Sequence, residues 1–171
     1  MQRQCKRSPV FSGRLLKVFK GKKTLPNGKK AYIEEIDHPG AVLVVPRLGK
    51  RIVFIRQYRA VIGKYIWELP AGTLEVNETP YKCAKREVSE ETGYGVSKLK
   101  KIGFIYTTPG FCNEKIHIFE AECTCRGEKE LDEDELIRLK LLTALEVRKL
   151  FLSGRINDSK TVAALAFAGV L

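Results

Sequence analysis

Residues 72–94 read GTLEVNETPYKCAKREVSEETGY, and the rest of the chain is best interpreted outward from them. The pattern predicts a helix over residues 79–91. Thr79 can serve as its N-cap, Pro80 suits the first helical position, and Gly93 suits the position just beyond its end. A helix with such defined ends fixes which of its side chains share a face.

Three glutamates of this helix have the spacing of neighbours on one face. Glu87 precedes Glu90 by three residues and Glu91 by four, and like charges at these spacings destabilise an isolated helix by roughly 0.2–0.5 kcal/mol per pair. A solvated charged face is one interpretation. A divalent cation with oxygen ligands is the other, because it turns the repulsion into binding. Arg86 lies four residues before Glu90 and can pair with it, which would orient the cluster.

Acidic residues are concentrated in two short stretches of a basic protein. The chain of 171 residues has a formal net charge of +11, yet eleven of its 20 Asp and Glu residues fall within 75–91 and 128–135. Concentrated like charge is unfavourable unless solvent or cations offset it. The pattern indicates either two solvated acidic faces or a divalent-metal site in a positive field. Such a field attracts an anionic partner, which could be a phosphorylated small molecule, a nucleic acid or a phospholipid.

Composition narrows the class of protein. With 44% hydrophobic and 30% charged residues the chain can bury a core, which excludes a disordered or collagen-like protein. No apolar run reaches the ~18 residues of a membrane-spanning helix, and no apolar segment follows the basic N-terminus as in a secretory signal. We therefore expect a cytoplasmic protein with no membrane span. The five cysteines form no CxxC pair and are expected to be reduced and mostly buried.

Strand and turn signals dominate the chain on both sides of the central helix. The turn LPNG at residues 25–28 separates a strand near 11–19 from one near 30–36. Residues 41–45 form a continuous apolar run that suits a strand buried on both faces. Further strands are expected over 51–58, 66–69, 99–107, 115–123 and 136–142.

Two helices are expected at the end of the chain. Thr143 and Glu146 form a capping box that opens a helix closed by Gly154. Asn157 or Asp158 caps a last helix. The order of elements predicts an α+β fold, an α/β/α sandwich in which a mixed sheet lies between helices, with an antiparallel strand region at the N-terminus.

The stretch 72–94 also matches a longer pattern, GX5EX7REUXEEXGU, in which U is a bulky apolar residue. Gly72 is followed after five residues by Glu78 and after seven more by Arg86, and Tyr94 occupies the last U. The stretch resembles the Nudix box of the Nudix hydrolases, with every fixed position present. The resemblance implies the Nudix fold and cleavage of a nucleoside diphosphate linked to another group. It also implies that Glu78 orients the preceding loop and Arg86 the carboxylates.

The same resemblance implies a metal site. Glu87 and Glu91 would be the main ligands of Mg²⁺, with Mn²⁺ as the alternative ion, and Glu90 a third ligand or partner. Gly72 would let the backbone carbonyl of Ala71 come near these carboxylates. Divalent ions held there would neutralise a pyrophosphate and lower the pKa of a bound water.

Segments outside the box resemble the ADP-ribose pyrophosphatase branch of this family. Pro109 lies fifteen residues beyond Tyr94 in YTTPGFCNE, residues 106–114, which is similar to the proline-containing loop of that branch. Short segments of the N-terminal half agree with it: VFSGR at 10–14, LPNG at 25–28, HPGAV at 38–42, RQYR at 56–59 and WELPAG at 67–72. The branch implies hydrolysis of ADP-ribose to AMP and ribose 5-phosphate with Mg²⁺.

In that branch a glutamate on an acidic loop beyond the box acts as general base or metal ligand. The acidic run at residues 132–135 is where it would lie. Glu135 is the first candidate, because the apolar alternation of the next strand starts just after it, and Glu133 is the second. A solvated acidic loop is the alternative interpretation.

Three residues are candidates for contact with the substrate. Arg59 matches a family arginine that contacts the substrate, although a structural ion pair would also account for it. Glu114 is a weaker candidate for the same pocket. Phe11 or Phe19 could stack on adenine, or either could belong to the core.

The branch usually forms homodimers that exchange N-terminal strands. We accordingly expect a dimer-forming strand region over residues 1–38 and a catalytic domain over 39–171. Strands before His38 need a partner to cover their edges, which agrees with such a dimer.

Two other functions stay open. The same fold and metal could act on a different substrate, such as a nucleotide sugar, a dinucleoside polyphosphate or a capped RNA, and the net charge of +11 keeps nucleic acid among the partners. Alternatively, the protein is a Nudix-fold module that binds nucleotide or nucleic acid without chemistry. The complete box argues against that function, since binding alone does not need carboxylate side chains that hold a metal ion.

Overall fold

The computed structural model describes residues 7–13, 16–126 and 137–171. The chain divides into two units. The first comprises Met1–Gly40 and Tyr106–Lys115, and the second comprises Ala41–Ile105 and Ile116–Leu171. The division of function between residues 1–38 and 39–171 stays a prediction.

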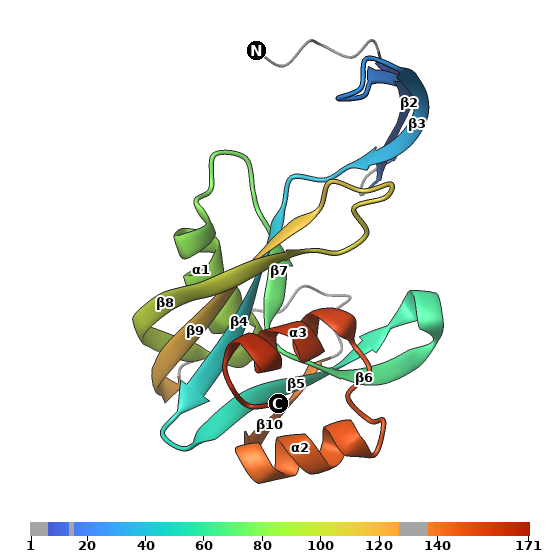
Figure 1. Ribbon diagram of the computed structural model, residues 1–171. Helices are drawn as coiled ribbons and strands as arrows, with labels where there is room; N and C mark the ends of the chain where they lie inside the picture. The colour runs from blue at the N-terminus through green and yellow to red at the C-terminus, as the bar shows by residue number, and fades with distance from the viewer. Residues whose placement is uncertain (1–6, 14–15, 127–136) are drawn as a thin grey trace. The chain divides into compact units, whose positions relative to one another are not determined.

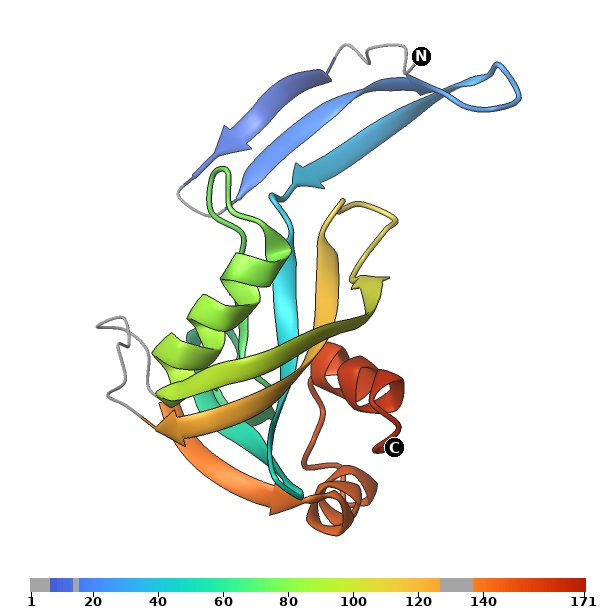
Figure 2. The same cartoon turned by 90° about the vertical axis from the view of Figure 1, so that its left-hand side faces the viewer.

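The first unit contains an antiparallel sheet of three strands, in the order β1 (Arg7–Ser12), β2 (Lys17–Thr24) and β3 (Lys30–Asp37). Figure 2 shows these strands side by side, with β2 and β3 joined as a hairpin. The turn predicted at residues 25–28 makes this hairpin: Gly28 has a φ of 79° and donates its N–H to the carbonyl of Leu25 at 2.9 Å. Glycine adopts such a positive φ without strain.

The single strand expected near 11–19 is wrong, because two strands divide that segment. β1 ends at Ser12 and β2 begins at Lys17. Between them the N–H of Gly13 bonds to the carbonyl of Leu16 at 2.9 Å, which turns the chain back on itself. Nothing in the local apolar pattern marks this reversal.

The second unit is built on a mixed sheet of seven strands (Figure 1). Its main path runs β10-β5-β4-β9-β8, with β6 paired to β5 and β7 paired to β4. β4 and β9 are parallel, whereas β5 is antiparallel to β4, β6 and β10. The strands are β4 (Ala41–Leu48), β5 (Arg51–Arg59), β6 (Lys64–Glu68), β7 (Ala71–Thr73), β8 (Tyr94–Tyr106), β9 (Lys115–Arg126) and β10 (Ile137–Thr143).

Three α-helices, α1 (Pro80–Thr92), α2 (Ala144–Leu152) and α3 (Ser159–Phe167), begin at the predicted caps. The side chain of Thr79 accepts the Lys82 N–H, Thr143 and Glu146 form the capping box, and Asp158 caps α3. Gly93, with a φ of 71°, ends α1 in the left-handed conformation. A short 3-10 helix, η1 (Ala60–Ile62), connects β5 to β6.

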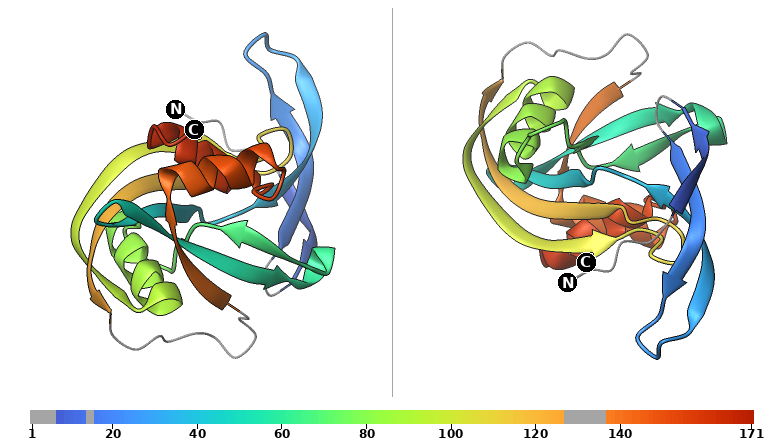
Figure 3. Two further views of the ribbon diagram at one scale, coloured as in Figure 1. Left: turned by 90° about the horizontal axis from the view of Figure 1, so that it is seen from below. Right: turned by 90° about the horizontal axis from the view of Figure 1, so that it is seen from above.

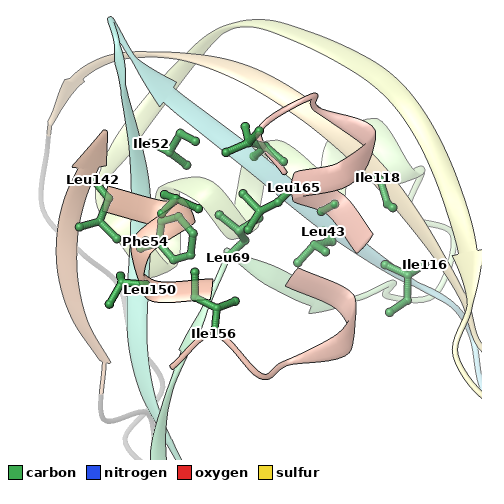
Figure 4. Packing of buried hydrophobic residues seen from close by; sticks show 14 of the residues in the cluster. Leu43, Ile52, Phe54, Leu69, Ile116, Ile118, Leu142, Leu150, Ile156 and Leu165 are labelled. Atoms are coloured by element: carbon green, nitrogen blue, oxygen red, sulfur yellow. The ribbon is translucent and has the colours of Figure 1, made fainter. Parts of the chain in front are cut away.

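The helices lie on opposite faces of the sheet, as Figures 2 and 3 show. α1 packs with Val42, Val44 and Phe119 on one face. On the other face, α2 and α3 pack against Leu43 and Phe54 in the cluster drawn in Figure 4. β4 is buried on both faces, which explains its uninterrupted apolar run and confirms the prediction for 41–45. The predicted mixed sheet between helices, with a separate N-terminal antiparallel sheet, is confirmed.

Strand boundaries are the least accurate part of the sequence prediction. β8 begins at Tyr94, directly after α1, rather than near residue 99. β7 was not predicted, because three residues that include a glycine show no alternation of apolar and polar side chains. β7 nevertheless has a defined place, since it pairs with β4.

Among the described cysteines, Cys83, Cys112 and Cys123 are free thiols. Burial raises the pKa of the Cys83 thiol to about 12 and that of Cys123 to about 11. Thiols with such raised pKa values are poor nucleophiles.

In the described part of the chain, every helix is too short or too polar to cross a membrane.

Candidate functional site

The inner face of α1 carries two carboxylates among small and apolar side chains. Glu87 is only 8% exposed and Glu91 only 3%, although Ala84 and Val88 on the same helix belong to the core. Burying a carboxylate is unfavourable unless a cation or hydrogen bonds compensate. A solvated charged face therefore does not describe these two residues.

The short strand β7 brings backbone atoms to the buried carboxylates. The N–H of Ala71 donates to Oε2 of Glu91 at 3.2 Å. A Cβ added at Gly72 would lie 1.8 Å from Oε1 of Glu87, a distance no side chain could occupy. Any side chain at this position of the box would therefore have to displace the Glu87 carboxylate. The sequence predicted that the backbone carbonyl of Ala71 comes near these carboxylates. In the structure it is the backbone N–H of Ala71 that contacts Glu91.

Arg86 connects the remaining acids of the box. Its Nε and Nη2 each donate to the Glu78 carboxylate at 2.9 Å, so that this pair is bidentate. Its Nη1 lies 2.7 Å from Oε1 of Glu87 and 2.9 Å from Oε2 of Glu90. The predicted pairing of Arg86 with Glu90 is thus present. One guanidinium thus contacts three carboxylates of the box.

The Glu78–Arg86 pair fixes the loop before α1. The Glu78 carboxylate also accepts the backbone N–H of Glu75 at 3.1 Å, and Arg86 Nη2 reaches the carbonyl of Thr73 at 3.3 Å. Hydrogen bonding from Arg86 lowers the pKa of Glu78 from its ordinary 4.5 to about 2. The Glu78 carboxylate is therefore charged at neutral pH.

A second ionic cluster lies in the same unit. The sequence predicted an ion pair for Arg59 but not the partners in the cluster. Arg59, at the end of β5, donates from Nη2 to Oε2 of Glu68 at 2.6 Å, and Lys160 donates to Oε1 at 2.6 Å. Glu68 is 1% exposed, while the Arg59 side chain is 40% exposed. The ion pair considered for Arg59 is present, and its guanidinium still has surface left for a ligand.

Sequence analysis missed Glu68 and Lys160. Glu68 stands in a short strand beside apolar residues, and a carboxylate at such a position is a signal of a buried, paired charge. Lys160 comes from α3, 92 positions away along the chain. Nothing in the local sequence connects the two residues.

The other candidate site residues lie in the first unit or outside the residues that the structure describes. Glu114 accepts a hydrogen bond from Thr107 Oγ1 at 2.8 Å and lies 3.6 Å from Nε2 of His38. Phe11 is on β1 and is 56% exposed. Glu133 and Glu135 fall outside the described residues.

The donor set of α1 and β7 fits a hard divalent cation. Glu87 and Glu91 offer carboxylate oxygens one helical turn apart, and Gly72 leaves the space beside them free of a side chain. Within residues 7–13, 16–126 and 137–171, no three acidic, His or Cys side chains are grouped so that they could hold a metal ion. Arg86 already contacts three of the four box carboxylates, so a bound ion would share Glu87 with it.

A family model described as "NUDIX domain" matches residues 37–165. The chain therefore belongs to the Nudix family and is a Nudix hydrolase; members of this family generally use divalent metal ions. The chain also has the fold of a crystal structure described as an ADP compounds hydrolase, with a TM-score of 0.82 at 22% identity, covering 98% of this chain and 94% of that one.

Several curated relatives resemble most of the chain. ADP-ribose pyrophosphatase of Bacillus subtilis is 39% identical, covering 92% of this chain and 87% of the relative. The methanol dehydrogenase activator of Bacillus methanolicus is also 39% identical, over 97% and 91%. GDP-mannose pyrophosphatase of Salmonella arizonae is 33% identical, over 84% and 82%. Relatives of equal identity thus have different names, so identity alone does not select a substrate.

The Gly72→Ala variant tests the close approach of β7 to Glu87. The added methyl group must displace the Glu87 carboxylate, and we expect divalent-metal affinity to fall by at least about tenfold. Calorimetric titration with Mn²⁺ measures this affinity. Gly110→Ala is the matched control, because a Cβ there meets no atom within 4 Å. Equal metal affinity in the two variants would show that the space beside Glu87 is not needed.

The Glu78→Gln variant tests the ion pair with Arg86 through its pH dependence. Since folding lowers the pKa of Glu78 from 4.5 to about 2, the carboxylate stabilises the folded state fully above about pH 4.5 and loses that contribution as the pH falls towards 2. The difference in unfolding free energy between wild type and variant should shrink over this window. Urea unfolding in EDTA buffer measures it. A difference that stays constant from pH 7 to 3 would rule out this linkage.

Proposed function

We propose that the protein hydrolyses the pyrophosphate of ADP-ribose, with Mg²⁺, to AMP and ribose 5-phosphate. The observation that carries the proposal is the buried pair Glu87 and Glu91, held against β7 within a complete Nudix box. The relative from Bacillus subtilis at 39% identity supports ADP-ribose as the substrate. In the reaction the oxygen of water bonds to one phosphorus while the bond from that phosphorus to the bridging oxygen breaks.

The box residues have distinct roles in this proposal. Glu87 and Glu91 are the principal ligands of Mg²⁺, or of Mn²⁺ in its place, and Glu90 is a third ligand or a catalytic partner. Arg86 keeps Glu87 and Glu90 oriented through the contacts of its Nη1. The backbone of Ala71 completes the site. The bound ion supplies charge neutralisation of the diphosphate and a lowered pKa for the attacking water.

The general base is proposed from the acidic run beyond the box. Glu135 is the first candidate and Glu133 the second. β10 begins at Ile137 and pairs with Gln57 of β5. The acidic run directly precedes this strand in the sequence, and β5 also carries Arg59.

Arg59, Glu114 and Phe11 are proposed contacts of the substrate. The Arg59 guanidinium is held by Glu68, and the Arg59 side chain is 40% exposed. A guanidinium in a fixed orientation recognises phosphate oxygens well. Glu114 is suited to accept hydrogen bonds from ribose hydroxyl groups. The exposed ring of Phe11 could stack on adenine.

We further propose a homodimer in which the strand region of residues 1–38 contacts the partner. β1 is an outer strand of the three-stranded sheet, and none of the described strands pairs with its outer edge. Edges of this kind are usually covered in native proteins. A second copy of the chain would cover them.

Another nucleoside diphosphate derivative is the alternative substrate. GDP-mannose is the leading one, because a relative of that name is 33% identical over 84% of the chain. Dinucleoside polyphosphates and capped RNA are further candidates of the same reaction type. A module that binds nucleotide without hydrolysis remains the third hypothesis. Release of a hydrolysis product would distinguish an enzyme from such a module.

The Glu91→Gln variant tests the proposed site. Loss of the charge at a buried metal ligand should lower kcat for ADP-ribose by roughly three orders of magnitude and leave the folded state intact. Release of AMP measures turnover, and circular dichroism measures folding. Glu122→Gln is the control, because Glu122 forms a surface pair with Lys98. EDTA should abolish turnover by wild type, and added Mg²⁺ should restore it.

A panel of diphosphate substrates assayed at one Mg²⁺ concentration tests the substrate. ADP-ribose should give the highest kcat/KM. Turnover of GDP-mannose well above that of ADP-ribose would overturn the proposed substrate but leave the box chemistry in place. Near-normal turnover by Glu91→Gln would instead reject the site itself.

A further inference from the structure

One face of the β2–β3 hairpin carries exposed lysines around a tyrosine. In the strand register Lys22 is opposite Tyr32, and Thr24 is opposite Lys30. Directly opposed residues in antiparallel strands point to the same face of a sheet. Lys20 is two positions from Lys22 and shares that face. We call the face formed by Lys20, Lys22, Lys30 and Tyr32 the lysine face.

The cations on the opposite face of this sheet, Arg7, Lys17 and Lys23, lie beside two carboxylates, those of Glu35 and Asp37. Arg7 pairs with Glu35 at 3.1 Å and with Asp37 at 2.8 Å, and Lys23 also pairs with Glu35. Hydrogen bonding, first of all from Lys23, lowers the pKa of Glu35. On the lysine face, in contrast, three ammonium groups share the surface with a single carboxylate, that of Glu34, which is opposite Lys20. The lysine face therefore has a larger excess of positive charge than the opposite face.

Tyr32 forms the wall of an open hollow on the lysine face. The hollow has a volume of about 420 Å³ and is lined by Gly21, Lys22, Lys30 and Tyr32. The Tyr32 side chain is 77% exposed, and Nζ of Lys22 lies 5.0 Å from the centroid of its ring. An exposed aromatic ring of this kind contributes nothing to a core.

We propose that the lysine face binds single-stranded nucleic acid. An exposed ring beside cations is the combination that such binding uses, since a base stacks on the ring and ammonium groups contact the flanking phosphates. The net charge of +11 strengthens attraction of a polyanion over longer distances. This activity is separate from the proposed hydrolysis, because none of its residues belongs to the Nudix box.

An anionic membrane surface is less suited to this face. Binding in the lipid interface requires exposed apolar side chains that enter the acyl region. The hollow is lined by two lysines, a glycine and a tyrosine. A Tyr ring between lysines suits a base and its phosphates better than lipid.

Fluorescence anisotropy of the full chain with a labelled oligouridylate in EDTA buffer tests the proposal. EDTA prevents metal-dependent hydrolysis, so the result does not depend on the proposed function. Tyr32→Ala should weaken binding by about tenfold, whereas Tyr32→Phe, which keeps the ring, should bind like wild type. Lys22→Glu with Lys30→Glu should weaken binding more strongly and make the slope of log affinity against log salt shallower by about 1.4.

Lys100→Glu with Lys101→Glu is the matched control, with the same change of charge at exposed positions of β8. All variants should keep the melting temperature, the oligomeric state and the ADP-ribose turnover of wild type. The proposal would be overturned by absence of binding at low salt, or by equal losses in the two double variants. It would also be overturned by unchanged affinity in Tyr32→Ala, or by tight binding to phosphatidylserine vesicles without binding to oligouridylate.

Discussion

Two carboxylates buried between α1 and β7 constrain the rest of the catalytic unit. Glu87 and Glu91 are almost inaccessible, and burial of such charge is tolerated only with close compensation. Arg86 and the N–H of Ala71 provide part of that compensation. The missing side chain of Gly72 provides the space. A divalent cation bound to these carboxylates would supply further positive charge.

The surrounding fold makes this arrangement rigid. β4 is buried on both faces and pairs with β7 on one side and with parallel β9 on the other. α1 packs on the same strand through small residues such as Cys83 and Ala84, which lets the helix come close to the sheet. The carboxylates are therefore positioned by core packing rather than by a loop, and a preorganised site of this kind needs little rearrangement to bind its ligands.

Sequence predicted those parts of the molecule that depend on local chemistry. The caps at Thr79 and Asp158 follow from the preference of an N-cap for a side-chain oxygen, and the shared face of the box glutamates follows from helical spacing. The convergence of Arg59 and Lys160 on Glu68 could not be predicted, because strands and helices distant in the chain bring them together. The chain reversal at Gly13 and the three-residue strand β7 leave no periodic signal. The box alone does not name the substrate, and relatives at equal identity have different names.

The most direct test of the central claim is a crystal structure of the protein with Mn²⁺ and a non-hydrolysable analogue of ADP-ribose. Anomalous scattering identifies manganese unambiguously. We expect at least one ion bound by carboxylate oxygens of Glu87 and Glu91, with the diphosphate of the analogue coordinated to it. A structure with the analogue bound and no ion on either glutamate would contradict a metal-binding role for the buried pair.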